Sequence, residues 1–201
     1  MKVKLIEISM AIGIVLTVMV SCLVEFKSTY DSLQENVLRM HILANSDSQE
    51  DQELKLKVRD ALLESSEEIF GDCSNIDDAE AQVSQKLDLI QQIAQDVVIE
   101  NGYDYTVQAE LTNMQFDDRT YDSIIMPSGY YDAIRVTIGS AEGHNWWCVM
   151  YPAMCVSAVS GDTQDVVEDY FDDDTVDILE NHERYELKFK CVEWLEDIYK
   201  R

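Results

Sequence analysis

The chain has 201 residues, of which 46% are hydrophobic, so it has enough apolar material for one folded domain with a terminal appendage. Asp and Glu number 40 against 15 Lys and Arg, which gives a net charge of −25. A surface of this charge repels nucleic acid and anionic lipid head groups, and we therefore expect no nucleic-acid partner.

The N-terminal segment has the order of charge and apolar residues that is typical of an export signal. Lys2 and Lys4 precede residues 8–24, an uncharged and mostly apolar run. The run is slightly shorter than the ~20 apolar residues of an ordinary membrane-spanning helix. Residues 1–24 are therefore predicted to be either a cleaved signal peptide or a membrane anchor, and residues 8–24 to be the only part that contacts a membrane. Cys22 ends a loose match to a lipidation motif, although a cysteine that falls by chance in an apolar run explains it better.

Two amphipathic helices are predicted after a polar lead-in at residues 25–49. The first begins near Asp51, carries apolar residues at helical spacing and stops at Gly71. The second begins after Asn75, which is a favoured helix N-cap, and ends before Gly102. Joined by a short loop, the two helices form an αα-hairpin, and its apolar stripes require a cover.

The apolar pattern then changes to period two, which indicates β-strands. It alternates from Tyr103 to Leu111 and again from Ile134 to Ile138, with Ile124–Met126 between them and Trp146–Tyr151 after them. Strands in series with short turns are expected to pair antiparallel.

A last helix is predicted after an acidic stretch at residues 162–177. It carries Phe189, Val192, Leu195 and Tyr199 on one face. The predicted fold class is therefore α+β: an N-terminal signal or anchor helix, an αα-hairpin packed on an antiparallel β-sheet, and a C-terminal helix, with residues 50–201 as a single domain.

The sequence contains no motif of a common catalytic site. Its histidines are His41, His144 and His182, and it lacks the nucleophile elbow, the zinc-protease helix motif and the glycine-rich phosphate loop. The enzymatic alternative that stays open is an exported hydrolase of the cell envelope, in which Cys148 is the nucleophile and His41 or His144 is the base.

No metal or cofactor site is expected either. His144, Cys148 and Cys155 lack a fourth zinc ligand, and the acidic run at 172–174 lacks the glycine and distal glutamate of a calcium loop. In an exported domain, Cys148 and Cys155 are candidates for a disulfide, and two buried thiols are the alternative.

Two segments concentrate polar and aromatic residues without catalytic spacing. Residues 38–48 contain His41, Asn45 and Asp47, and residues 143–155 contain Asn145, Trp146 and Trp147. Neighbouring residues of a strand point to opposite faces, so one tryptophan can serve the core while the other faces outward. We expect these six residues to make or support the contact with a partner protein. A helix-capping turn and ordinary core packing are the alternatives.

The same segments resemble the stage II sporulation protein R family. The matching stretches are LRMHILANSDSQEDQELKLKVRD at 38–60 and IIMPSGYYDAIRVTIGSAEGHNWWCVMYPAMC at 124–155, after an apolar N-terminal segment. Gln49 and Ala153 stand where the family leads us to expect proline. Neither departure removes a chemically special group.

The resemblance implies a function that the residues alone do not. Proteins of this family are exported from the forespore into the intermembrane space, where they trigger a membrane-embedded sporulation protease (stage II sporulation protein GA-like), an aspartic protease that processes the sigma-E precursor. The resemblance therefore implies a signalling ligand rather than an enzyme, either released or held by an uncleaved N-terminal segment. A structural protein of the envelope, anchored by residues 8–24, is a further alternative.

Overall fold

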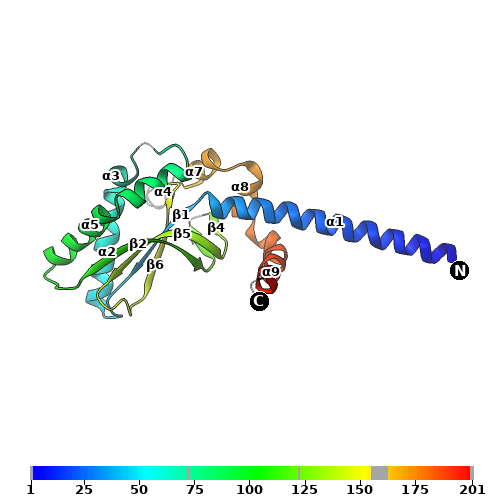
Figure 1. The fold of residues 1–201 in the computed structure, drawn as a ribbon. Coiled ribbons are helices and arrows are strands. Elements are labelled where there is room, and N and C mark those ends of the chain that lie inside the picture. The colour runs from blue at the N-terminus through cyan, green and yellow to red at the C-terminus, as the bar shows by residue number, and fades with distance from the viewer. Residues whose placement is uncertain (1, 72, 122, 155–162, 200–201) are drawn as a thin grey trace.

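One long helix links the apolar N-terminal segment to the folded domain. The computed structural model describes residues 2–71, 73–121, 123–154 and 163–199, and begins with α1 (Lys2–Glu35). Apolar side chains from Ile6 to Val24 are exposed, and the helix is long and apolar enough to cross a membrane. Beyond them Phe26, Tyr30 and Leu33 recur every three or four residues and are buried, so α1 enters the domain without a break (Figure 1).

The central sheet has four strands in the order β2-β5-β1-β6. They are β1 (Leu38–Leu43), β2 (Val107–Phe116), β5 (Gly129–Ile138) and β6 (Asn145–Tyr151). β1 is parallel to β5 and antiparallel to β6, so the sheet is mixed rather than purely antiparallel.

The strand β1 was not predicted from the sequence. It lies within residues 25–49, which were predicted to be a polar lead-in. Leu38 to Ile42 are all buried. Leu38, Met40 and Ile42 face the helices, and Arg39 and His41 are buried on the other face of the strand. A strand that is buried on both faces does not show the alternation by which strands are recognised in a sequence.

A layer of helices covers one face of the sheet (Figure 1). The αα-hairpin is confirmed, although each arm is interrupted once, at Ser65 and at Lys86. Ser48 and Asn75 cap the first helix of each arm, because their side chains accept the amide hydrogens of Asp51 and Asp78. The four helices are α2 (Gln49–Glu64), α3 (Ser66–Phe70), α4 (Ile76–Gln85) and α5 (Leu87–Glu100).

Among the described residues, those that cover the other face of the sheet lie at one end of it. A two-stranded hairpin, β3 (Arg119–Tyr121) and β4 (Ile124–Met126), packs there with the end of α1 and with α8 (Asp173–Glu180). The acidic stretch forms α7 (Thr163–Tyr170) and most of α8.

The last helix, α9 (His182–Tyr199), packs on α1 rather than on the sheet. Phe189 and Val192 are buried against Phe26 and Tyr30, as the predicted apolar face requires, and the side chains of residues 195 and 199 lie outside the described part of the chain. The observed architecture confirms the α+β class, with an N-terminal apolar helix and C-terminal helices around a mixed sheet.

Candidate partner-binding face

The two segments that stand out in the sequence lie side by side in the structure. β1 comes from the first segment and β6 from the second, and the two strands pair antiparallel with His41 opposite Trp147 and Leu43 opposite Asn145. Residues about one hundred positions apart therefore form one continuous surface.

The two tryptophans point to opposite faces, as the strand period requires. Trp146 packs against the helix-side core, where the guanidinium of Arg59 lies 5.4 Å from the centre of its ring. Trp147 packs on the other face, together with Phe116. The structure thus separates Trp146 from His41, Asn145 and Trp147, which share a face.

A row of four side chains crosses that face, one from each strand of the sheet. Its order is Glu110, Arg135, His41 and Trp147, because the strand registers place each residue opposite the next. Arg135 Nη1 donates to Glu110 Oε1 at 3.1 Å, and the rings of His41 and Trp147 stack with 3.9 Å between centroids and 3° between planes. Arg119 lies on the neighbouring hairpin, and its guanidinium is 5.8 Å from the Trp147 ring.

His41 is buried in the middle of this row. It is 4% exposed, and neither ring nitrogen makes a hydrogen bond of good geometry. Burial lowers the pKa of His41, the nearby Asn145 side chain opposes that effect, and the positive charge of Arg135 adds to it. The imidazole is therefore held in its neutral form and serves as a flat platform beneath Trp147.

The next row outward is not covered by any described element. It consists of Gln108, Thr137, Leu43 and Asn145, which are exposed or half-buried. Figure 1 shows the helices gathered on the opposite side of this end of the sheet. We call the two rows together, residues 108, 110, 135, 137, 41, 43, 145 and 147, the bare face.

Arg39 belongs to the covered part of the same side of the sheet. It is fully buried, with its guanidinium 4.1 Å from the Phe116 ring centroid and 4.9 Å from that of Tyr131. Its Nη2 donates to the Tyr121 hydroxyl at 3.0 Å. Arg39 therefore makes cation–π contacts with two strands of the sheet, which are strongest where water is excluded, and its hydrogen bond to Tyr121 ties the hairpin to the sheet.

Asn45 and Asp47 lie at the edge of the bare face and hold its loops in place. Asn45 bonds both to Asp51 at the start of α2 and to Ser140 in the turn between β5 and β6. Asp47 accepts hydrogen bonds from the backbone and from the ring of His144 in the same turn. These two residues support the bare face by holding its loops together rather than by forming it.

In the turn between β5 and β6, the backbone of Gly139 lies close to the side chain of Asn45. Gly139 has φ of +60°, and a Cβ there would lie 2.2 Å from Asn45 Oδ1. Any larger residue would therefore displace Asn45, because the conformation and the space both require glycine.

Asp51 is the centre of the polar network under this turn. It is 4% exposed and accepts hydrogen bonds from Asn45 Nδ2 at 2.9 Å and from the Ser46 hydroxyl. Burial alone would raise the pKa of Asp51, but the hydrogen bonds from Ser46, Asn45, Tyr105 and Ser48 outweigh it and the pKa is lowered. The carboxylate is therefore stabilised in its charged form.

The arrangement gives no support to a cysteine nucleophile. Cys148 is 2% exposed, disulfide-bonded and on the face opposite His41, while the His144 side chain is exposed and held by Asp47. Cys22 and Cys191 are free. Residue 155 lies outside the described residues, so the predicted Cys148–Cys155 pairing stays a prediction.

The described residues contain no cluster of His, Cys, Asp or Glu that could hold a metal ion. The acidic run that begins at Asp172 instead starts a helix: Asp172 caps α8 by accepting the amide hydrogen of Thr175 at 2.8 Å, and two further acids occupy its first turn. Negative charge at this position interacts favourably with the helix dipole.

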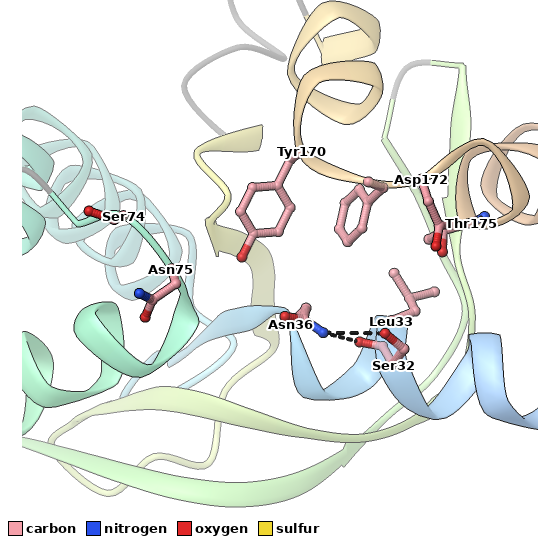
Figure 2. Close-up of a pocket in the computed structure, with 9 residues that line it drawn as sticks. Ser32, Leu33, Asn36, Ser74, Asn75, Tyr170, Asp172 and Thr175 are labelled. Atoms are coloured by element: carbon pink, nitrogen blue, oxygen red, sulfur yellow. Dashed lines mark hydrogen bonds between the residues drawn. The ribbon is translucent and has the colours of Figure 1, made fainter.

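A polar pocket of about 300 Å³ lies between the end of α1, the start of α4 and the turn between α7 and α8. Figure 2 shows that Tyr170 points into it, and that the Asn36 amide is directed to Ser32 on α1. Its polar side chains are used locally: Asn75 and Asp172 cap helices, and Asn36 donates to the Ser32 carbonyl at 2.7 Å. Among the described residues that line it, Asp172 is the only charged one, and its carboxylate is used in capping α8.

Arg135 and Glu110 were not among the residues predicted from the sequence. The signal was present in the period-two pattern, because Arg135 lies between the inward-facing Ile134 and Val136 and must point to the other face. Which residue of another strand lies beside it depends on the register, which the pattern does not give.

Comparison with known proteins identifies the family. The family model described as Stage II sporulation protein R (spore_II_R) matches residues 34–161. The Stage II sporulation protein R of Bacillus subtilis (strain 168) is 30% identical, and the match covers 83% of this chain and 83% of that protein. No solved structure matches. Since the matched residues include all four strands of the sheet and the helices that cover it, the chain belongs to the stage II sporulation protein R family.

Proposed function

We propose that this chain is an exported signalling ligand of sporulation. Made in the forespore, it enters the intermembrane space and activates a membrane-embedded aspartic protease, similar to stage II sporulation protein GA, which then processes the sigma-E precursor. The observation that carries the proposal is the bare face on a chain of this family: a sheet surface that no described element covers, with stacked and cationic side chains and no catalytic pair among its described residues.

Export is supported by the first part of α1. Its apolar side chains between Ile6 and Val24 are exposed, which is unfavourable in water and favourable in a bilayer. The following buried residues, Phe26 and Tyr30, belong to the domain itself, so a cut between the two parts would leave the packed section of the helix in place.

Activation requires a difference in affinity. A ligand shifts a protease towards its active state only by binding that state more tightly than the inactive one. A shift from about 1% to about 99% active needs a preference of roughly 10⁴-fold. Trp and Arg side chains at the centre of an interface supply binding energy of this order, and the bare face contains Trp147 and Arg135.

The proposal is tested in sporulating cells from which the gene has been deleted. The sigma-E precursor should persist uncut, and the full chain produced only in the forespore should restore its processing. A chain without residues 1–24 should not restore it, because it stays in the forespore. Normal processing in the deletion strain would refute the proposed function.

The rival hydrolase makes the opposite prediction about Cys148. If its thiol were a nucleophile, Cys148→Ser would abolish function and leave stability unchanged. The disulfide and the burial of Cys148 favour a role in stability instead.

A further inference from the structure

The bare face differs in charge from the rest of the molecule. The whole chain carries 40 acids against 15 bases, whereas the two rows of the bare face carry Arg135 and Glu110, with Arg119 of the hairpin beside Trp147. Screening limits electrostatic interactions to about 8 Å at physiological ionic strength, so a docking segment senses this local charge more than the distant acids.

Arg135 has binding capacity that the fold does not use. Its Nη1 donates to the exposed carboxylate of Glu110, and 40% of the side chain is exposed, whereas the Nε is buried. A guanidinium offers a planar fork that matches a carboxylate in a bidentate pair, which is stronger and more directional than a single contact. Glu110 shows by its own position that a carboxylate can lie against Arg135.

The surroundings of Arg135 have the shape and composition of a docking site. A hollow of about 540 Å³ lies beside it at the β2 edge of the sheet, lined by Gln108, Glu110 and Thr137 of the bare face and also by Gln91 of α5. In the same row lies Trp147, held rigidly by the stack on His41 and flanked by Arg119. A rigid aromatic side chain next to an arginine is the combination found most often at energetic centres of interfaces.

We infer that the bare face binds an acidic segment of the partner protein, with a carboxylate of that segment paired to Arg135 and its neighbouring residues packed on Trp147. The identity of the partner rests on the proposed function, whereas the chemistry of the segment rests on the face itself. The pair between Arg135 and Glu110 then acts as an internal competitor that the partner carboxylate displaces.

This inference gives opposite predictions for two variants that break the same ion pair. Arg135→Gln removes the group that binds the partner, while Glu110→Gln removes the competitor and leaves Arg135 available. Both lose the same exposed cross-strand contact, so their effects on folding are matched. Arg135→Lys keeps the charge without the fork and should fall between wild type and Arg135→Gln.

The measurement is site-specific photocrosslinking of the full chain in sporulating cells. A photoreactive residue replaces Asn145 on the bare face, and a control chain carries it at Gln92, which is exposed on α5. Mass spectrometry of the crosslinked peptide identifies the segment. We expect an Asp- or Glu-containing segment of another protein from position 145, and no such product from position 92.

In the Asn145 background, Arg135→Gln should reduce the yield of this product about ten-fold, and Glu110→Gln should raise it at least about two-fold. A change of both variants in the same direction would overturn the inference, as would a product formed with lipid, with a basic segment or with a second copy of this chain. The yield does not depend on precursor processing. Normal processing in the deletion strain would therefore refute the proposed function. The crosslinking yields of the two variants would still decide whether the docked segment is acidic.

Discussion

Asn45 and Ser140 are joined by three hydrogen bonds although they are 95 residues apart in the chain. Ser140 N donates to Asn45 Oδ1 at 2.9 Å, and the Ser140 hydroxyl donates to the carbonyl and side-chain oxygens of Asn45 at 2.7 and 3.2 Å. The amide group of Asn45 also donates to the buried Asp51. One side chain thus links the start of α2 to the turn that leads into β6.

Replacing Asn45 by Ala should therefore destabilise the fold. Two side-chain links are lost and Asp51 keeps fewer donors, so we expect the free energy of unfolding to fall by about 2 kcal/mol. Chemical denaturation of the full chain in detergent measures this change. Gln92→Ala, at an exposed position, is the control and should change stability by less than about 0.5 kcal/mol. Equal stability of the two variants would show that the network around Asn45 contributes nothing.

Stability should depend on pH through His41. Burial holds the pKa of folded His41 below its ordinary value, so between the two values the unfolded chain binds more protons than the folded one. Stability contributed by neutral His41 is therefore present above the unfolded pKa of about 6.5 and is lost as the pH falls towards the folded pKa.

This contribution is measured by comparing wild type with His41→Phe, which keeps an aromatic ring against Trp147. Urea unfolding between about pH 7.5 and about pH 5.5 should show a loss of stability in wild type that is smaller in the variant. Identical pH dependence in both proteins would contradict the assignment of a buried neutral imidazole.

Phe189→Ala should release α9 from α1. The Phe189 ring packs edge-on against Phe26 and Tyr30, with centroids 5.0 and 5.4 Å away, and the side chain is 6% exposed. Removing a buried aromatic ring costs about 3–5 kcal/mol. Because α9 lies at the end of the chain, we expect rapid proteolysis within residues 182–199 while the sheet domain stays resistant. Leu187→Ala, at an exposed position of the same helix, should leave the cleavage rate unchanged.

Cys148→Ser should lower the melting temperature without a specific effect on signalling. Cys148 is buried and disulfide-bonded, so the variant loses both the covalent link and apolar packing. A reducing agent should lower the melting temperature of wild type and have little further effect on the variant. A fully stable variant that fails to signal would instead favour the hydrolase.

The helical layer could be predicted from the sequence because capping residues and an apolar stripe of helical period mark where the helices lie. Asn75 is the N-cap that its residue type predicts, and the apolar stripe from Ile76 to Val97 has the helical period throughout. The interruption at Lys86 was not predicted, since no glycine or proline marks it.

The candidate site was only partly predictable. His41, Asn145 and Trp147 stood out by residue type, and the structure places them on one face. The row that joins His41 to Arg135 depends on the parallel pairing of β1 with β5, and a shift of one residue would have turned Arg135 to the other face. Arg39 likewise gains its role from Phe116 and Tyr131, which are distant in the chain.

The unbroken helix α1 also limits the distance between the domain and any membrane that residues 6–24 span. From Val24 to Glu35 the helix continues for eleven residues, about 16 Å at 1.5 Å per residue, before the sheet begins. With residues 6–24 in a membrane, the helix would pass without a break into the buried residues Phe26, Tyr30 and Leu33, so the domain would lie close to the lipid surface. Under the proposed function, the protease would then meet the ligand close to the membrane, and a cut just before Phe26 would convert a contact-dependent signal into a diffusible one.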